Sequence, residues 1–272
     1  MRSLFEKLAS LKKRLCKVWD RPLYIFTYLK IYRLYKTPRF QMTHTGLLGK
    51  DLLVADAAST VFMYKEIFEN EIYKFKADKS EPRIVDCGAN IGMSIIYFKK
   101  LYPAAKIIAF EPDKRIYDIC QRNIQAFQLP EVELVNKALW SERTTLNFYA
   151  EGADGGRLVQ VGDNKNIVKV ETDVLSGYLG QPVDLLKMDI EGAELEVLRE
   201  SEKSLYNVER IFVEYHSFVG KKQKLDEMLA ILARSGFRIH VQVPGIISPQ
   251  PFCEHKNWAG MDLQLNLFAF RE

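Results

Sequence analysis

Short apolar runs alternate with helical stripes from residue 83 to the end of the chain. An unbroken apolar run is typical of a strand buried on both faces, whereas apolar residues spaced three or four apart are typical of an amphipathic helix. The pattern predicts strands at 84–87, 106–110, 132–138, 183–190, 210–215, 237–243 and 263–270. It predicts helices at 93–101, after Asp113, from about 192 to 205, and at 221–235, where Gly236 ends the helix. Two further β segments, 144–149 and 167–171, flank a Gly-rich loop and are interpreted as an insertion.

This alternation indicates an α/β fold with a parallel sheet covered by helices on both faces. Ligands of such sheets bind beyond the carboxyl ends of the strands. The residues that end the strands are therefore the first candidates for a functional site. Acidic residues stand at several of these ends, among them Glu111, Asp189 and Glu214.

The first 75 residues carry helical rather than strand periodicity. Leucines and aromatic residues at helical spacing predict two helices within 1–37, separated by Pro22 and stopped by Pro38. A short extended segment is expected over 39–56, and a further helix over 61–75. The stretch before residue 83 is thus predicted to be mostly helical.

The charge is divided unevenly between the two ends of the chain. Residues 1–50 contain 12 Lys and Arg against 2 Asp and Glu, whereas residues 51–272 contain 27 against 33. We therefore expect a basic, aromatic helical extension over 1–50 and one larger acidic domain over 51–272. The composition, 47% hydrophobic and 27% charged, excludes a collagen-like or mostly disordered chain.

Three roles are open for the basic extension. Its apolar face can cap the domain or contact a second copy in a homodimer, which is the interpretation we favour. A basic amphipathic helix can also lie on an anionic membrane surface. Basic residues interleaved with aromatic ones can bind nucleic acid, which is the least favoured of the three.

The sequence favours a reducing, cytoplasmic compartment, or the inner face of a membrane. The apolar run without a charge at 22–29 is far shorter than the roughly 20 residues that span a bilayer. No small-residue cleavage site indicates a secretory signal. The four cysteines form neither a CxxC pair nor a zinc pattern, and we expect Cys87 and Cys120 to be core residues.

The segment 86–92, Asp-Cys-Gly-Ala-Asn-Ile-Gly, joins the first of the predicted strands to a helix. Its glycines allow a tight turn and a close approach to a ligand. A dinucleotide-binding turn has a further glycine in the middle, and a carboxylate at Asp86 would repel a pyrophosphate. Asp86 suits an ammonium group instead, such as that of S-adenosylmethionine, and Glu111 can accept hydrogen bonds from both ribose hydroxyls.

Five ordered segments resemble the FkbM family of S-adenosylmethionine-dependent methyltransferases. They are VDCGANIGMSIIYF (85–98), IIAFEPD (107–113), VNKALWSERTTLNFY (135–149), DLLKMDIEGAELEVL (184–198) and IFVEYH (211–216). The segment YKEIFENEIYKF (64–75) is similar to the lead-in helix of the family. The resemblance implies a Rossmann-like class I methyltransferase fold with seven strands, the last of them antiparallel. It also implies methyl transfer to a hydroxyl oxygen, often of a sugar, glycan or natural product.

Carried over to this sequence, the family pattern assigns the cofactor pocket. Asp86, Gly88, Asn90 and Gly92 would shape the methionine and ribose part of the pocket. Glu111 would hold the ribose, and Ala138 would lie against the adenine.

Four residues near the fourth and fifth strands are candidates for the chemical step: Lys187, Asp189, Glu214 and His216. Methyl transfer needs an aligned acceptor hydroxyl that loses its proton. In one mechanism, which we favour slightly, His216 or Asp189 takes this proton directly. In the other, Asp189 and Glu214, with or without His216, hold a divalent ion such as Mg²⁺ that lowers the hydroxyl pKa.

Several alternatives remain open. Glu194 can be a solvated helix residue, and Glu191 can be an acid favoured by the start of a helix. His44, His240 and His255 are interpreted as structural, and the loop 152–162 is expected to border the acceptor site. At the level of function, the alternatives are a nicotinamide-dependent oxidoreductase and a non-catalytic binding protein with the same fold.

Overall fold

The fold is taken from a computed structural model of the chain. It describes residues 22–153, 155–158, 166–244, 248–254, 256–257 and 260–271. The helix predicted before Pro22 lies outside the described residues, as do Cys16, Asp154, His255 and all of residues 159–165.

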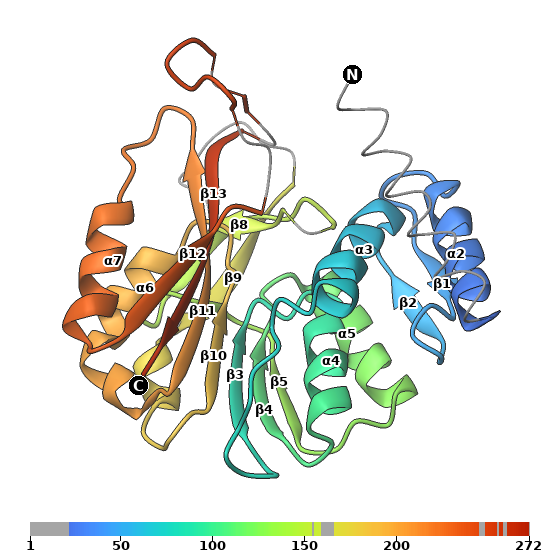
Figure 1. Cartoon of the computed structure of the whole chain (residues 1–272), viewed down its shortest axis with the longest axis horizontal. Coiled ribbons are helices and arrows are strands. Elements are labelled where there is room, and N and C mark those ends of the chain that lie inside the picture. The colour runs from blue at the N-terminus through green and yellow to red at the C-terminus, as the bar shows by residue number, and fades with distance from the viewer. Residues whose placement is uncertain are drawn as a thin grey trace.

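A seven-stranded sheet forms the centre of the molecule (Figure 1). Its spatial order is β12-β13-β11-β10-β3-β4-β5. The strands are β3 (Arg83–Cys87), β4 (Lys106–Phe110), β5 (Val132–Val135), β10 (Leu185–Met188), β11 (Arg210–Phe218), β12 (Arg238–Gln242) and β13 (Met261–Phe270). Strands β5, β4, β3, β10 and β11 pair in parallel, and β13 is antiparallel to both of its neighbours. The expected seven strands with an antiparallel last strand are confirmed.

Helices cover both faces of this sheet (Figure 1). One face carries α3 (Ala57–Tyr64) with a π-helical turn (Lys65–Glu69), α4 (Met93–Leu101) and α5 (Lys114–Ala126). The other face carries α6 (Glu194–Ser201), a 3₁₀ turn (Glu202–Asn207) and α7 (Leu225–Arg234). Neighbouring residues of a strand point to opposite faces, so Ile84 belongs to the first apolar core, whereas Val85 and Cys87 belong to the second. The expected core role of Cys87 and Cys120 is confirmed.

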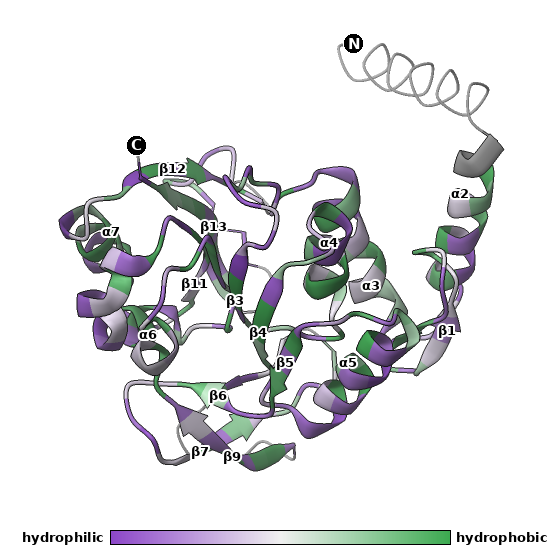
Figure 2. Ribbon diagram, turned by 90° about the horizontal axis from the view of Figure 1, so that it is seen from below, coloured by the Kyte–Doolittle hydropathy of each residue, from purple (hydrophilic) through white to green (hydrophobic). Residues whose placement is uncertain are grey.

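The N-terminal part packs on α3 and α5, two of the helices that cover the first face of the sheet. It consists of α2 (Pro22–Tyr35) and a hairpin of β1 (Thr43–Thr45) and β2 (Leu52–Val54). Ile31 and Leu34 are buried in the same core as Ile84, whereas aromatic residues on the outer side of α2, such as Tyr28, are exposed. Figure 2 shows α2 and β1 at one end of the molecule and α6 and α7 at the other. The boundary at residue 50, which falls within the hairpin, and the three roles of the extension stay predictions.

Within the described residues, no helix combines the length and the apolar character that crossing a membrane requires.

A second sheet of four short strands stands beside the first. It consists of β6 (Ala138–Leu139), β7 (Thr145–Tyr149), β8 (Arg157–Leu158) and β9 (Ile167–Asp173), in the order β6-β9-β7-β8. The predicted strand 132–138 was therefore wrong as one element. Val132–Val135 pairs with β4, whereas Ala138 and Leu139 turn away to pair with β9.

Two predicted helix boundaries also need correction. The helix expected over 61–75 begins at Ala57, because the Asp56 side chain accepts a hydrogen bond from the Ser59 amide, and it ends at Glu69. The helix expected from 221 begins only at Leu225. Lys221 instead closes a turn, since its amide donates to the carbonyl of Phe218.

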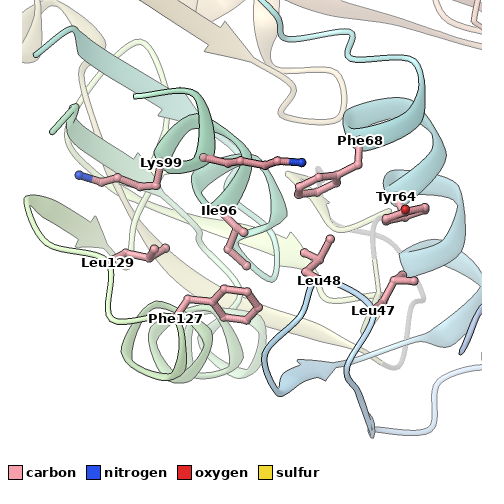
Figure 3. A pocket seen from close by; sticks show the side chains of 9 residues that line it. Leu47, Leu48, Tyr64, Phe68, Ile96, Lys99, Phe127 and Leu129 are labelled. Carbon is pink, nitrogen blue, oxygen red and sulfur yellow. The ribbon is translucent and has the colours of Figure 1, made fainter. Parts of the chain in front are cut away.

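A small apolar cavity of about 410 Å³ lies between the hairpin loop, α3, α4 and α5 (Figure 3). Its walls are formed by Leu47, Leu48, Tyr64, Phe68, Ile96, Lys99, Lys100, Phe127 and Leu129. Lys99 donates to the carbonyl of Ala105. None of the expected site residues lines this cavity.

Candidate functional site

A cavity of about 950 Å³ lies at the carboxyl ends of the central strands. Further walls come from α3, from the π-helical turn and from the segment Phe148–Leu158. Seven of the ten expected site residues line it: Gly88, Asn90, Glu111, Ala138, Lys187, Asp189 and Glu214. Asp86, Gly92 and His216 lie behind the cavity wall. The structure thus brings the expected residues together, and it separates those that can touch a ligand from those that support them.

The glycines of the β3–α4 turn are required by the packing of the chain itself. Gly88 has φ +100°, and a Cβ atom there would lie 1.9 Å from the carbonyl oxygen of Asp189. Gly92 has φ +88°, and a Cβ atom there would lie 3.0 Å from Sγ of Cys120. Gly88 therefore allows the end of β3 to contact the end of β10. Gly92 allows the start of α4 to pack closely against α5.

Glu111 is a buried acid that faces the cavity at the end of β4. Its Oε2 accepts from the Asn90 amide (3.0 Å), and its Oε1 accepts from the Asp113 amide (2.9 Å). Burial raises the pKa of Glu111 to about 8, more than these hydrogen bonds lower it. Since each carboxylate oxygen has a second lone pair, Glu111 can still accept hydrogen bonds from two hydroxyls of a ligand.

Asn90 connects the β3–α4 turn to the segment after β7. Its backbone has φ +48°, and its Nδ2 donates to the carbonyl of Ala153 (3.0 Å). Described residues of the loop 152–162 thus line the cavity, and its role at the acceptor site stays a prediction. Gly152, Ala153 and Arg157 all line the cavity, and Arg157 belongs to β8 rather than to a loop.

Asp86 and Lys187 form a buried ion pair at the cavity wall, with Lys187 lining the cavity and Asp86 behind it. Nζ of Lys187 lies 3.2 Å from Oδ1 of Asp86, and it donates to the Gly88 carbonyl at 2.5 Å. Oδ2 of Asp86 accepts from the Ser94 hydroxyl (2.5 Å). Burial would lower the pKa of Lys187, but the charges of Asp86 and Asp189 outweigh it and raise that pKa. Lys187 is therefore a fixed cation that cannot take a proton, and Asp86 holds it rather than facing a ligand directly.

Asp189, Glu214 and His216 meet because β10 and β11 are neighbouring parallel strands. Met188 pairs with Val213, so the next residues, Asp189 and Glu214, stand side by side. His216 follows Glu214 by two positions and therefore points to the same face of the sheet. Gln264 on β13 donates a hydrogen bond to Oε1 of Glu214. Burial, with the nearby charge of Asp189 as the second cause, raises the pKa of Glu214 to about 8.

His216 is buried between carboxylates. Its Nδ1 lies 2.9 Å from Oε1 of Glu194, which also accepts from the Gly192 amide (3.0 Å). Burial would lower the pKa of His216, but the charges of Glu191 and Glu194 outweigh it and hold that pKa well above 6.5. Glu194 is thus a buried partner of His216 and not a solvated helix residue, and Glu191 precedes α6 in a turn with φ +54°.

Two polar residues near Asp189 and Glu214 also line the cavity but were not predicted from the sequence. Glu66 of the π-helical turn lines it, and burial followed by the charge of Asp189 raises the pKa of Glu66 to about 7. Gln264 on β13 is the second. The available signals were an acid within the lead-in segment and polar residues alternating with leucines over 263–267.

Comparisons with known proteins identify the family. The model of the methyltransferase FkbM domain matches residues 86–239. Methyltransferase sdnD from Sordaria araneosa is 34% identical over 215 residues, covering 65% of this chain and 82% of that protein. The 31-O-demethyl-FK506 methyltransferase FkbM from Streptomyces tacrolimicus is 23% identical over 228 residues, covering 70% and 86%.

One solved structure supports the same conclusion for the fold. The crystal structure of methyltransferase FkbM from Methylobacillus flagellatus KT aligns with a TM-score of 0.51 and 14% identity, covering 79% of this chain and 53% of that one. The fold is the Rossmann-like class I methyltransferase fold, as expected. The family match argues against a nicotinamide-dependent oxidoreductase. On the matched domain and the 34% identical relative, this chain belongs to the FkbM methyltransferase family.

Proposed function

We propose that this methyltransferase uses S-adenosylmethionine and transfers the methyl group to a hydroxyl oxygen of a sugar, a glycan or a natural product. The observation that carries the proposal is one continuous cavity with Glu111 at one part of its wall and Asp189 and Glu214 at another. The name of the FkbM relative, a 31-O-demethyl-FK506 methyltransferase, supports transfer to oxygen on a natural product.

The residues present fit S-adenosylmethionine. Glu111 offers carboxylate oxygens to ribose hydroxyls, and Ala138 offers a small apolar surface for a base. Asp189, Glu191 and Glu214 line the cavity and complement the positive sulfonium and ammonium groups of this donor. The cavity, at about 950 Å³, lies at the upper end of the range of about 300–1,000 Å³ that is usual for ligand pockets, so it has room for this donor.

The reacting part of the site is formed by Asp189 and Glu214. Bound S-adenosylmethionine supplies the electrophilic methyl group. Asp189 and Glu214 orient the acceptor hydroxyl for in-line attack, and Asp189 accepts its proton as the new O–C bond forms and the S–C bond breaks. Lys187 keeps Asp189 in place through an ion pair of 3.6 Å. His216, behind the wall and bonded to Glu194, supports Glu214 rather than taking the proton itself.

An uncharged or cationic acceptor fits this site better than an anionic polymer does. Four acids line the cavity near the expected methyl group: Glu66, Asp189, Glu191 and Glu214. The charges of Asp189 and Glu191 would repel a phosphate at this point, whereas the raised pKa values of Glu66 (about 7) and Glu214 (about 8) leave these two acids partly or largely protonated at neutral pH. This supports a small-molecule or glycan acceptor.

The test combines donor binding with an acceptor screen. Calorimetry should show binding of S-adenosylmethionine, and Glu111→Ala should weaken it at least tenfold. Glu133→Gln, which changes an exposed acid on β5, is the matched control and should bind like the wild type. Sugars, glycans and hydroxylated natural products are then screened for formation of S-adenosylhomocysteine. Absence of donor binding, or preference for NAD, would refute the proposal.

A further inference from the structure

His216 directs an imidazole nitrogen at two carboxylates without forming a hydrogen bond to either of them. Its side chain is only 1% exposed. Nε2 lies 3.8 Å from Oε1 of Glu191 and 3.9 Å from Oε1 of Glu214. Both distances exceed those of an N–H···O hydrogen bond. The nitrogen therefore stands near acceptors that it does not bind directly.

The other ring nitrogen of His216 is held by Glu194. Nδ1 lies 2.9 Å from a Glu194 oxygen that already accepts backbone amides of the β10–α6 turn. An ionised carboxylate is an acceptor only, so Nδ1 carries a hydrogen and the ring orientation is fixed. A carboxylate that orients a histidine through one nitrogen, leaving the other for an ion, is the usual arrangement around metal-binding histidines.

Three donor atoms converge at this point. One oxygen of Asp189, one oxygen of Glu214 and one nitrogen of His216 all lie within 4.8 Å of one another. Two atoms that bind the same ion at about 2.1 Å lie about 3–4 Å apart. The spacing is therefore close to that of three ligands around one ion, and a small adjustment of side chains would complete it.

We propose that Asp189, Glu214 and His216 form a binding site for a divalent first-row transition-metal ion, of the kind represented by Zn²⁺ or Co²⁺. The presence of this metal site does not depend on the proposed methyl transfer. Only the catalytic role of the metal rests on the proposed function. Asp189 and Glu214 line the cavity, so the open positions of the ion would face the acceptor.

The donor set selects the kind of ion. Mg²⁺ prefers oxygen ligands in a near-ideal octahedron and keeps several waters, whereas imidazole nitrogen suits Zn²⁺, Fe²⁺ and related ions. The participation of His216 therefore argues against the Mg²⁺ expected from the acids alone. The local charge favours a cation as well, since Asp189, Glu191, Glu194 and Glu214 surround one histidine and one lysine.

A bound ion would serve the reaction by binding the acceptor oxygen. It would lower the pKa of the hydroxyl and orient the oxygen. The hydroxyl proton would leave to a cavity carboxylate or to water, the O–CH₃ bond would form, and the S–CH₃ bond would break to give S-adenosylhomocysteine. No oxidation or reduction is involved.

The experiment measures metal binding directly on the full-length protein after removal of metals with a chelator. Co²⁺ is the probe, because its visible absorption reports nitrogen and oxygen ligands, and Mg²⁺ is the comparison. We expect one Co²⁺ per chain, bound at least tenfold more tightly than Mg²⁺. Asp189→Asn and Glu214→Gln should each weaken Co²⁺ binding at least tenfold, and Glu194→Gln should weaken it about 10–100-fold by releasing the ring of His216.

The control is Glu202→Gln, which removes an acid paired with Arg234 on the surface. It should bind Co²⁺ like the wild type, and urea unfolding should show that each variant is folded. If the wild type binds no Co²⁺, or if neither Asp189→Asn nor Glu214→Gln changes the affinity, the metal site is refuted. Donor binding is measured separately on metal-free protein, so loss of the metal site would leave the proposed methyl transfer intact.

Discussion

Glu111 is the residue at which burial and ligand binding are most directly connected. Its pKa of about 8 means that the carboxyl is largely protonated at neutral pH, whereas ribose hydroxyls donate best to the ionised form. Binding of S-adenosylmethionine should therefore release a proton, and the affinity should rise with pH until about 8. The rise is at most about tenfold per pH unit. Calorimetry between pH 6 and 9 measures it.

Glu111→Gln is the variant that isolates this effect. The amide cannot ionise, so the affinity at pH 8.5 should fall at least tenfold and its pH dependence should flatten. Titration of the ligand itself affects both proteins equally, so the difference between the two curves reports Glu111. Parallel curves for the two proteins would show that Glu111 does not contact the ligand.

The buried pair of Asp86 and Lys187 should matter more for stability than for direct ligand contact. Removing one partner of a buried ion pair leaves an uncompensated charge and costs about 3–5 kcal/mol. We expect Asp86→Asn to lower the free energy of unfolding by about this amount, measured by urea unfolding. Adding Lys187→Met removes the remaining charge and should restore part of the loss, but not all of it, because Asp189 then loses its ion pair of 3.6 Å with Lys187.

The matched control is the exposed pair of Asp118 and Lys114 on α5. Exposed pairs contribute little, so Asp118→Asn should leave the unfolding curve almost unchanged. An equal effect of the two aspartate substitutions would contradict the role assigned to Asp86.

Among the elements, α3 depends on an N-cap that also holds the preceding chain. The buried carboxylate of Asp56 accepts from the amides of Ser59 (3.0 Å) and Phe40 (2.6 Å) and from Nε of Arg39 (2.9 Å). Loss of a cap costs about 0.5–2 kcal/mol, and loss of the further hydrogen bonds to the Phe40 amide and to Arg39 adds about 0.5–1.5 kcal/mol each. Asp56→Ala should therefore lower the free energy of unfolding by about 2–4 kcal/mol in urea.

A second N-cap provides the comparison for this prediction. Asp113 caps α5 through the amides of Arg115 and Ile116, without a distant partner. Asp113→Ala should cost about 1 kcal/mol. If the two caps cost the same, the contact of Asp56 with Phe40 and Arg39 contributes nothing.

Elements governed by local signals could be predicted from the sequence, whereas those governed by distant partners could not. The predicted bounds of α4 and β4 agree with the structure, because an apolar pattern and clear ends define both. The segment 132–138 was predicted as one strand, yet it divides between two sheets, because Val132–Val135 pairs with β4 and Ala138–Leu139 pairs with β9. Residues 71–75 continue a helical pattern, but the chain turns at Glu71, which has φ +52°.

At the scale of the whole molecule, the difference between local signals and distant partners also decides which residues of the candidate site could be predicted. Strand ends pointed to Glu111, Asp189 and Glu214, because parallel strands end at one edge whatever their order. Glu66 was missed, since only the packing of the lead-in helix over that edge brings it to the cavity. The support of Asp86 for Lys187 was also missed, because strand pairing across the sheet, and not spacing along the chain, makes them neighbours.

The stability of the whole molecule should depend on pH through acids whose pKa values are shifted in opposite directions. Burial raises the pKa of Glu111 to about 8, so between its usual value of 4.5 and 8 the folded protein holds a proton that the unfolded chain has lost. The contribution of Glu111 to the free energy of unfolding is complete below pH 4.5. It is lost as the pH rises to 8, at up to about 1.4 kcal/mol per pH unit. Glu66, with a pKa of about 7, acts in the same direction.

Protonation of Asp173 should lower the free energy of unfolding at low pH. Burial would raise its pKa, but hydrogen bonds from Arg143, the Val174 amide and Tyr178 lower it to about 2. Its contribution is present above pH 3.8 and is lost as the pH falls to 2. Unfolding in urea from pH 3 to 8.5 should therefore show greatest stability near pH 4–5. Glu111→Gln should make the loss of stability toward pH 8 less steep and leave the stability below pH 4 unchanged. A wild-type protein that becomes more stable from pH 5 to pH 8 would contradict this prediction.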